Sequence, residues 1–270
     1  MKIGTALIRH SQASAVLVEA ALLTALHNAQ IDPRQDAVSG VLLFLSEAFA
    51  PLIPAALQTA MHTTSSTNIS GALCAGLLNE HGWVMDSPAA AAMVFSGAHM
   101  HLAKPDDAHC LMLVGAPHAL NTHWLNQGSQ LRFGSLTNDV QFWHAGRQRA
   151  ASDAPLALAF DPFELCGFDN TVPMPEQLDG PPRFGFLFPK IDMVLSDVHA
   201  LDRQLSQLRN SYPGLPLLGL FDPGAAGHVL PFPNQSGSPQ DSAQIRHHIS
   251  ADHNLLVFAH LRTDRRAHHV

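Results

Sequence analysis

The sequence is poor in cysteine, in charge and in long apolar runs. Its three cysteines among 270 residues form no Cys-x-x-Cys pair, which argues against a disulfide framework and favours a reducing compartment. Only 14% of the residues are charged, and no run of Lys or Arg supplies the cation cluster that nucleic-acid binding needs. No stretch of about 18 residues is apolar enough for a membrane span, and the N-terminus has no signal-peptide pattern. We therefore expect a cytoplasmic protein with neither nucleic acid nor membrane as a partner.

The hydrophobic residues, 46% of the chain, are enough for a large core, and their order predicts an α/β protein. Ser11 is a good N-cap for a helix over Gln12–Ala29, whose apolar residues recur on one face. Val41–Leu45 is a continuous apolar run, typical of a strand covered on both faces. Early prolines predict a helix over about 51–62, and Ile69–Cys74 is the next expected strand.

Further along the chain, Ala91–Leu102 has the pattern of one long strand, and Arg147–Asp153 is the best candidate for a link between two halves. The prolines in Gly167–Lys190 predict an irregular excursion rather than a regular helix. Within it, Phe184–Phe188 alternates aromatic with other residues, which indicates a strand at a sheet edge. Ser196 or Asp197 is expected to cap a helix that ends at Asn210.

One pattern occurs twice: strand, helix, strand and a turn of small residues. In the first half it comprises VSGVLLFLS (38–46) and NISGALCAG (68–76). In the second half it comprises PLALAFDPF (155–163) and LPLLGLFDPGAAG (215–227). The repetition predicts an α/β fold with mixed β-sheets flanked by helices, built from two related strand-helix-strand halves.

The same repetition suggests how the chain is divided. We assign residues 1–146 to the first half and residues 147–261 to the second half. The second half then contains the proline-rich insertion 167–190, and residues 262–270 form a flexible tail.

The repeated segments, together with MKIGTALIRHSQASAVLVEAAL at the N-terminus, resemble the N-terminal FIST domain. The resemblance covers roughly residues 1–261 and is weakest across 117–149 and the proline-rich insertion. This chain has Leu73 and Leu220 where the family often has a small residue, and the C-terminal FIST domain that usually follows has no room in it. FIST proteins are intracellular sensory or signal-transduction proteins.

The resemblance implies binding of a small ligand such as an amino acid, and a separate signalling protein as partner. One branch of the family is described as haem-containing, but no residue here can be matched to a haem ligand of that branch. We therefore expect no cofactor, and haem stays open as an alternative.

The turns after the second strand of each repeat are the first candidate site. Their glycines let a backbone approach a ligand closely and present N–H groups to an anion; tight turns without a ligand are the alternative. Asp161 ends a buried strand, where open α/β sheets place functional groups, although an Asx turn before Pro162 explains it equally well. The predicted ligand-binding residues are Gly71, Cys74, Gly76, Asp161, Gly219, Asp222 and Gly224.

The cysteines and histidines offer a second class of function. Cys74 is the cysteine whose position most favours reactivity, but no base or positive environment can be identified for it, and a buried inert thiol is the favoured interpretation; Cys110 and Cys166 are expected in the core. His99 and His101 point to one face if they lie on a strand, because their spacing is i, i+2. No later residues complete a trusted zinc pattern, so no metal site is predicted.

We favour a non-catalytic small-ligand-binding sensory protein and leave catalysis open. One alternative is a metal- or thiol-dependent enzyme that uses His99, His101 or Cys74. The other is a partner-binding adaptor, whose contact surface would be the proline-rich insertion with Phe184–Phe188.

Overall fold

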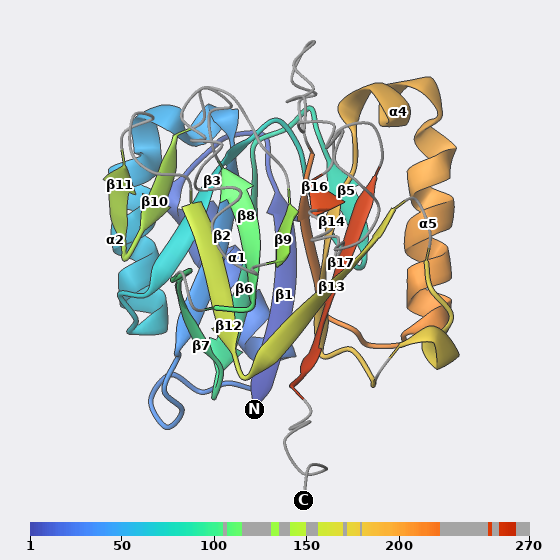
Figure 1. Cartoon of the computed structure of the whole chain (residues 1–270). Helices are drawn as coiled ribbons and strands as arrows, with labels where there is room; N and C mark the ends of the chain where they lie inside the picture. The colour runs from blue at the N-terminus through green and yellow to red at the C-terminus, as the bar shows by residue number, and fades with distance from the viewer. Residues whose placement is uncertain are drawn as a thin grey trace, which may run out of the picture.

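A computed structural model describes residues 1–104, 107–114, 131–134, 141–149, 156–169, 172–178, 180–221, 248–249 and 254–262. Over these ranges the chain is a mixed α/β protein with three mixed β-sheets. Helices lie on two opposite sides of the sheets, with α1 and α2 on one side and α4 and α5 on the other (Figure 1). No helix within the described ranges is both long and apolar enough to span a membrane.

The first sheet has the strand order β1-β6-β2-β3-β10-β11. Only β2 and β3 are parallel neighbours; the other four pairs are antiparallel. The connection between β2 and β3 runs through η1 (Glu47–Leu52) and α2 (Ile53–Thr64). Helices α1 (Ala15–Asn28) and α2 pack their apolar faces against this sheet. The strands are β1 (Lys2–Arg9), β2 (Gly40–Ser46), β3 (Ile69–Cys74), β6 (Ala89–Ser96), β10 (Phe142–His144) and β11 (Arg147–Arg149).

The third sheet has the strand order β13-β17-β14-β15-β4-β5, and its pattern of parallel and antiparallel pairs is the same as that of the first sheet. Again only its two middle strands, β14 and β15, are parallel. They are connected through α4 (Ile191–Ser196) and α5 (Val198–Ser211), and α5 packs against the outer face of this sheet. The strands are β4 (Leu77–Asn79), β5 (Gly82–Val84), β13 (Phe163–Asp169), β14 (Phe184–Phe188), β15 (Leu217–Leu220) and β17 (Leu255–Leu261).

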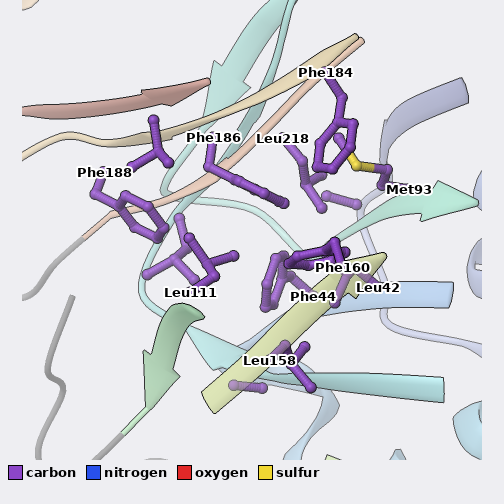
Figure 2. Packing of buried hydrophobic residues seen from close by; sticks show 14 of the residues in the cluster. Leu42, Phe44, Met93, Leu111, Leu158, Phe160, Phe184, Phe186, Phe188 and Leu218 are labelled. Atoms are coloured by element: carbon purple, nitrogen blue, oxygen red, sulfur yellow. The ribbon is translucent and has the colours of Figure 1, made fainter. Parts of the chain in front are cut away.

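The second sheet, in the order β16-β9-β8-β12-β7, completes a core shared by all three sheets. Its strands are β7 (His99–Leu102), β8 (His109–Val114), β9 (Leu131–Gly134), β12 (Leu156–Asp161) and β16 (His248–Ile249). Figure 2 shows Phe160 of this sheet packed with Phe44 of β2 and Phe184 of β14. The ring centroids of Phe160 and Phe184 are 5.6 Å apart, an edge-to-face contact that adds to the apolar burial.

The first helix begins later than the sequence predicts. It starts at Ala15, and its N-cap is Ser14 rather than Ser11. The Ser14 hydroxyl accepts a hydrogen bond from the N–H of Leu17 at 3.3 Å, which satisfies one of the free donors of the first turn. The prediction of Ser11 as the cap is therefore wrong, because a cap is defined by this local bond and two serines compete for it.

The long strand predicted over Ala91–Leu102 is two strands in different sheets. β6 pairs with β1 and β2 in the first sheet, whereas β7 pairs with β12 in the second. Gly97, with φ of +81°, lies between them, and this backbone conformation favours glycine. The chain uses this glycine to leave one sheet and enter the next.

The predicted link at Arg147–Asp153 begins with a strand. Arg147–Arg149 is β11 and forms a hairpin with β10 through Ala145 and Gly146, whose φ values are +52° and +69°. Two positive φ values match the twist of a tight hairpin, so this pair of residues sets the turn. Residues 150–153 lie outside the described ranges.

The proline-rich insertion also contains a regular strand. β14 (Phe184–Phe188) is buried along its whole length and pairs with both β15 and β17, so the predicted sheet edge is wrong and the predicted irregular excursion does not hold here. Pro181, Pro182 and Pro189 flank β14 rather than interrupt it, so every N–H that the ladder needs is available. A short 3-10 helix, η2 (Pro175–Gln177), precedes this strand.

The second strand-helix-strand unit is composed differently from the sequence prediction. We expected Leu156–Asp161 to be its first strand, but that strand, β12, pairs with β7 and β8 in the second sheet. The strand that runs parallel to β15 is β14. Both are short apolar runs, and such runs do not encode which neighbour they pair with.

Candidate functional site

The end of β15, which leads into the second predicted turn, lies next to Gly76 of the first predicted turn. The N–H of Phe221, which directly follows β15, donates to the carbonyl of Gly76 at 3.0 Å. The adjacent residues Leu77 and Leu220 are partners in the pairing of β4 with β15. Asp222 and Gly224, the other predicted ligand-binding residues of the second turn, lie outside the described residues.

The predicted glycines have clear packing roles. A Cβ atom on Gly71 would lie 1.8 Å from the carbonyl oxygen of Leu43, and one on Gly219 would lie 2.1 Å from that of Leu187. A Cβ on Gly76 would lie 2.7 Å from the Phe221 ring. Glycine is therefore required for the close approach of neighbouring chain segments, and ligand contact by these residues stays a prediction.

The three cysteines lie in different environments. Cys74 is buried, and burial, followed by the nearby Glu47 carboxylate, raises the pKa of its thiol far above neutrality. A thiol nucleophile needs the opposite, so Cys74 is not placed for reactivity. Cys110 lies in the core as predicted. Cys166 packs against the core but is only partly buried, so it is more exposed than predicted, and its Sγ lies 3.8 Å from Nδ1 of His260.

Asp161 lies in a charged cluster with His101 and Arg262. Its carboxylate is 3.8 Å from Nδ1 of His101 and 3.9 Å from the guanidinium of Arg262. His101 Nε2 lies 3.2 Å from Asp107, and the His101 ring stacks on His99 with centroids 5.2 Å apart. The predicted common face of the two histidines is thus confirmed.

This cluster does not form a ready metal site. Across the described part of the chain, no group of three or more His, Cys, Asp or Glu side chains is arranged to hold a metal ion. Nδ1 of His101 is buried, and no hydrogen bond to it is formed within the same residues. The histidine pair therefore supplies a polar contact between β7 and β12 without a complete coordination sphere.

A pocket of about 490 Å³ lies between β1, the end of α1, the β4–β5 hairpin and the loop after α5. Its walls thus come from segments that are far apart in the sequence. Its polar lining side chains include Thr5, Asn28, Glu80, His81 and Arg209. Pockets of this size accept small organic ligands when a few polar groups converge in them.

Glu80 is the central polar group of this pocket, and its side chain is 17% exposed. The Thr5 hydroxyl donates to its carboxylate at 2.6 Å, and the N–H of Leu217 donates to Oε2 at 3.1 Å. Asn28 supports the site from behind by donating to the carbonyl of Thr5 at 2.9 Å. These bonds hold the Glu80 carboxylate in place, and His81 Nε2 stands 3.7 Å from it.

Sequence reasoning missed Glu80. It lies in the tight turn Asn79–Gly82 between two three-residue strands, where a polar residue is ordinary. The only available sign was a carboxylate between two apolar runs, and that sign does not distinguish a pocket from a solvated turn. Its partner Leu217 is 137 positions away in the chain.

A second pocket of about 540 Å³ adjoins the first and shares with it Ile3 and the loop 212–216. Pro175, Pro181 and Pro182 of the proline-rich insertion line it. Phe184, Phe186 and Phe188 are fully buried, so they cannot form the surface that the adaptor alternative assigns to them. In the adaptor alternative, the candidate contact surface is then formed by the prolines of the insertion that line this pocket.

No protein-family model matches the chain, and a search of curated proteins also gives no match.

Proposed function

We propose that the chain is a cytoplasmic, ligand-binding sensory protein of FIST type, whose small ligand occupies the pocket at Glu80. The observation that carries this proposal is the positioned Glu80 carboxylate inside a pocket of about 490 Å³. The ligand signals to a separate protein partner, as the family resemblance implies. The seven residues predicted from the repeat turns and Asp161 remain candidates for further contacts.

The proposal includes two related halves, and the sheet topology supports this relation. The first and third sheets have the same sequence of pairing directions around one parallel pair. In each parallel pair a glycine, Gly71 or Gly219, presses against a leucine carbonyl of the neighbouring strand, that of Leu43 or Leu187. In the proposed relation between the halves, β2 therefore corresponds to β14, in place of the segment 155–163, and β3 corresponds to β15.

The chemistry of the pocket favours a zwitterion such as an amino acid. The Glu80 carboxylate accepts hydrogen bonds and attracts an ammonium group, whereas the Arg209 guanidinium is suited to a carboxylate. Tyr212–Leu217 supplies apolar wall for a side chain. The walls of the pocket come from both halves of the chain. A ligand that binds one relative position of these walls more tightly than another shifts the protein toward that conformation.

The test is a calorimetric titration of the protein with individual amino acids, preceded by a thermal-shift screen. We expect Glu80→Gln to weaken binding at least about tenfold, because charge-assisted hydrogen bonds are the stronger ones. Glu19→Gln, which changes an exposed carboxylate on α1 outside the pocket, is the matched control and should bind like the unchanged protein.

A second variant separates binding from stability. Arg209→Gln changes an exposed side chain whose hydrogen-bond partner is Ser206, so the fold should tolerate it. We expect it to weaken binding of ligands with a carboxylate and to leave simple amines unaffected. The proposal is wrong if no amino acid binds the unchanged protein, or if Glu80→Gln and Glu19→Gln bind equally well.

A further inference from the structure

A second constellation, away from the Glu80 pocket, contains a thiol, an imidazole and a carboxylate. Cys166 and Glu164 lie on β13, two residues apart, so both side chains are on one face of the strand. His260 on β17 is the direct cross-strand partner of Glu164. The antiparallel ladder thus makes the three side chains neighbours, although 94 positions separate Cys166 from His260.

The atoms of this constellation face one another in a chain. Sγ of Cys166 is 3.8 Å from Nδ1 of His260, and the opposite ring nitrogen, Nε2, is 3.9 Å from Oε2 of Glu164. One nitrogen of the ring is therefore directed to the thiol and the other to a carboxylate. This is the nucleophile, base and orienting group of thiol chemistry, with the looser distances common before a substrate binds.

The surroundings of the thiol distinguish it from the other two cysteines. Cys74 and Cys110 are buried, whereas Cys166 has partial access to solvent on β13, the edge strand of the third sheet. In the resting form the thiol also donates a hydrogen bond to the carbonyl of Phe258 at 3.7 Å. Cys166 is thus the one cysteine with both solvent access and an adjacent base.

Charged groups from several elements face this site. Arg262 holds its Nε 3.6 Å from Glu164, and Nδ1 of His109 on β8 donates a hydrogen bond to the carbonyl of Leu165 at 2.7 Å. Burial lowers the pKa of His109, so this imidazole stays neutral near pH 7. Burial and then the charge of Cys166 raise the pKa of Tyr212, whose ring lies beside Phe258. The neighbouring cations are therefore Arg262 and, once it has taken a proton, His260.

The geometry points to a nucleophilic thiol site at Cys166, with His260 as proton acceptor and Glu164 as its orienting group, that reacts with small peroxides. His260 Nδ1 takes the thiol proton, and Glu164 stabilises the resulting imidazolium. The thiolate attacks one peroxide oxygen, so an S–O bond forms while the O–O bond breaks. Cys166 is oxidised to a sulfenic acid, and the peroxide is reduced to hydroxide or alkoxide, which takes the proton from His260.

The first test measures the rate of alkylation of each cysteine by iodoacetamide in the native protein, with peptide mapping by mass spectrometry as a function of pH. We expect Cys166 to react at least about tenfold faster than Cys74 and Cys110 near neutral pH. In His260→Gln the rate at Cys166 should fall, and its pH midpoint should rise by about one pH unit. Glu164→Gln should shift the midpoint in the same direction by less.

Controls keep this test decisive. His199→Gln changes an exposed histidine on α5 outside the site and should leave the rate at Cys166 unchanged. Alkylation of the urea-unfolded protein should equalise all three cysteines, which separates intrinsic from environmental reactivity. If His260→Gln unfolds more easily than the unchanged protein, Glu164→Gln alone carries the comparison, because its side chain is one-third exposed.

The second test uses hydrogen peroxide with dimedone, which traps sulfenic acids. We expect a dimedone adduct at Cys166 in the unchanged protein and a strongly reduced adduct in His260→Gln. Equal pH midpoints in the unchanged protein and both variants would overturn the assignment of base and orienting group. Fast alkylation without any dimedone adduct would overturn the reaction with peroxides.

Discussion

Glycines inside strands decide how closely the two parallel strand pairs approach. Gly71 and Gly219 each leave room for a leucine carbonyl that a Cβ atom would overlap, at 1.8 Å and 2.1 Å. Such a contact is with backbone, so it cannot be relieved by turning a side chain. Overpacking of this kind costs stability even for one added methyl group.

We predict that Gly219→Ala lowers the free energy of unfolding by at least about 2 kcal/mol, since the neighbouring strand must move. Gly82→Ala, on β5 of the same sheet, is the control, because nothing lies within 4 Å of its added Cβ. That change should stay within about 0.5 kcal/mol. Urea unfolding measures both, and similar losses in the two variants would contradict the close-approach argument.

Cys74 and Cys166 show how far the environment of a single residue can be predicted from the sequence. Cys74 ends β3 and had the position that most favoured reactivity among the three cysteines, but it is buried, as the favoured interpretation of an inert thiol expects. Cys166 was expected in the core, yet it lies beside His260. A residue's environment is set by its neighbours in space, so sequence position alone does not identify which of these thiols has an imidazole beside it.

At the scale of elements, helix α1 provides a direct comparison of two candidate caps. Ser14 accepts a hydrogen bond from the N–H of Leu17, whereas the Ser11 hydroxyl lies 3.4 Å from Nδ1 of the neighbouring His10 ring. We predict that Ser14→Ala lowers the free energy of unfolding by about 1 kcal/mol, the usual effect of losing a helix cap. Ser11→Ala should change it by less than about 0.5 kcal/mol. Urea unfolding of both variants checks this, and the reverse order would restore Ser11 as the cap.

Many elements were predictable because their signals are local. The fully buried run of β2 and the strand β3 were expected within a residue or two, as was helix α5 with its cap Asp197, whose side chain accepts from Ala200. The break between β6 and β7 was missed, because the apolar β6 and the alternating β7 both have strand-like patterns and Gly97 marks the change of sheet.

At the scale of the whole molecule, the two halves of the chain exchange strands. β4 and β5 follow β3 in sequence but join β15 in the third sheet, and β12 joins β7 and β8 in the second. Glu80 adds a side-chain link from this hairpin to both Thr5 and Leu217. Sheets shared in this way leave unpaired edges on either half when it is alone.

We predict that fragments 1–146 and 147–270, produced separately, do not unfold cooperatively. Mixed or co-expressed, they should form a complex with one cooperative transition, because each then regains its missing strands. Circular dichroism during urea unfolding measures this. A cooperative transition in either fragment alone, with the stability of the intact protein, would identify the halves as independent domains.

The amino-acid sequence by itself determined the class of the protein and most of its elements. Apolar runs, helix periodicity and caps act over a few residues, so α/β content, β2, β3 and α5 follow from local physics. Only the tertiary structure decided which strands are neighbours, and with them both proposed sites. The bonds from Glu80 to Leu217 and from Cys166 to His260 span 137 and 94 positions. Short buried strands are interchangeable in pattern, and their order in the sheets is set by how the whole core packs.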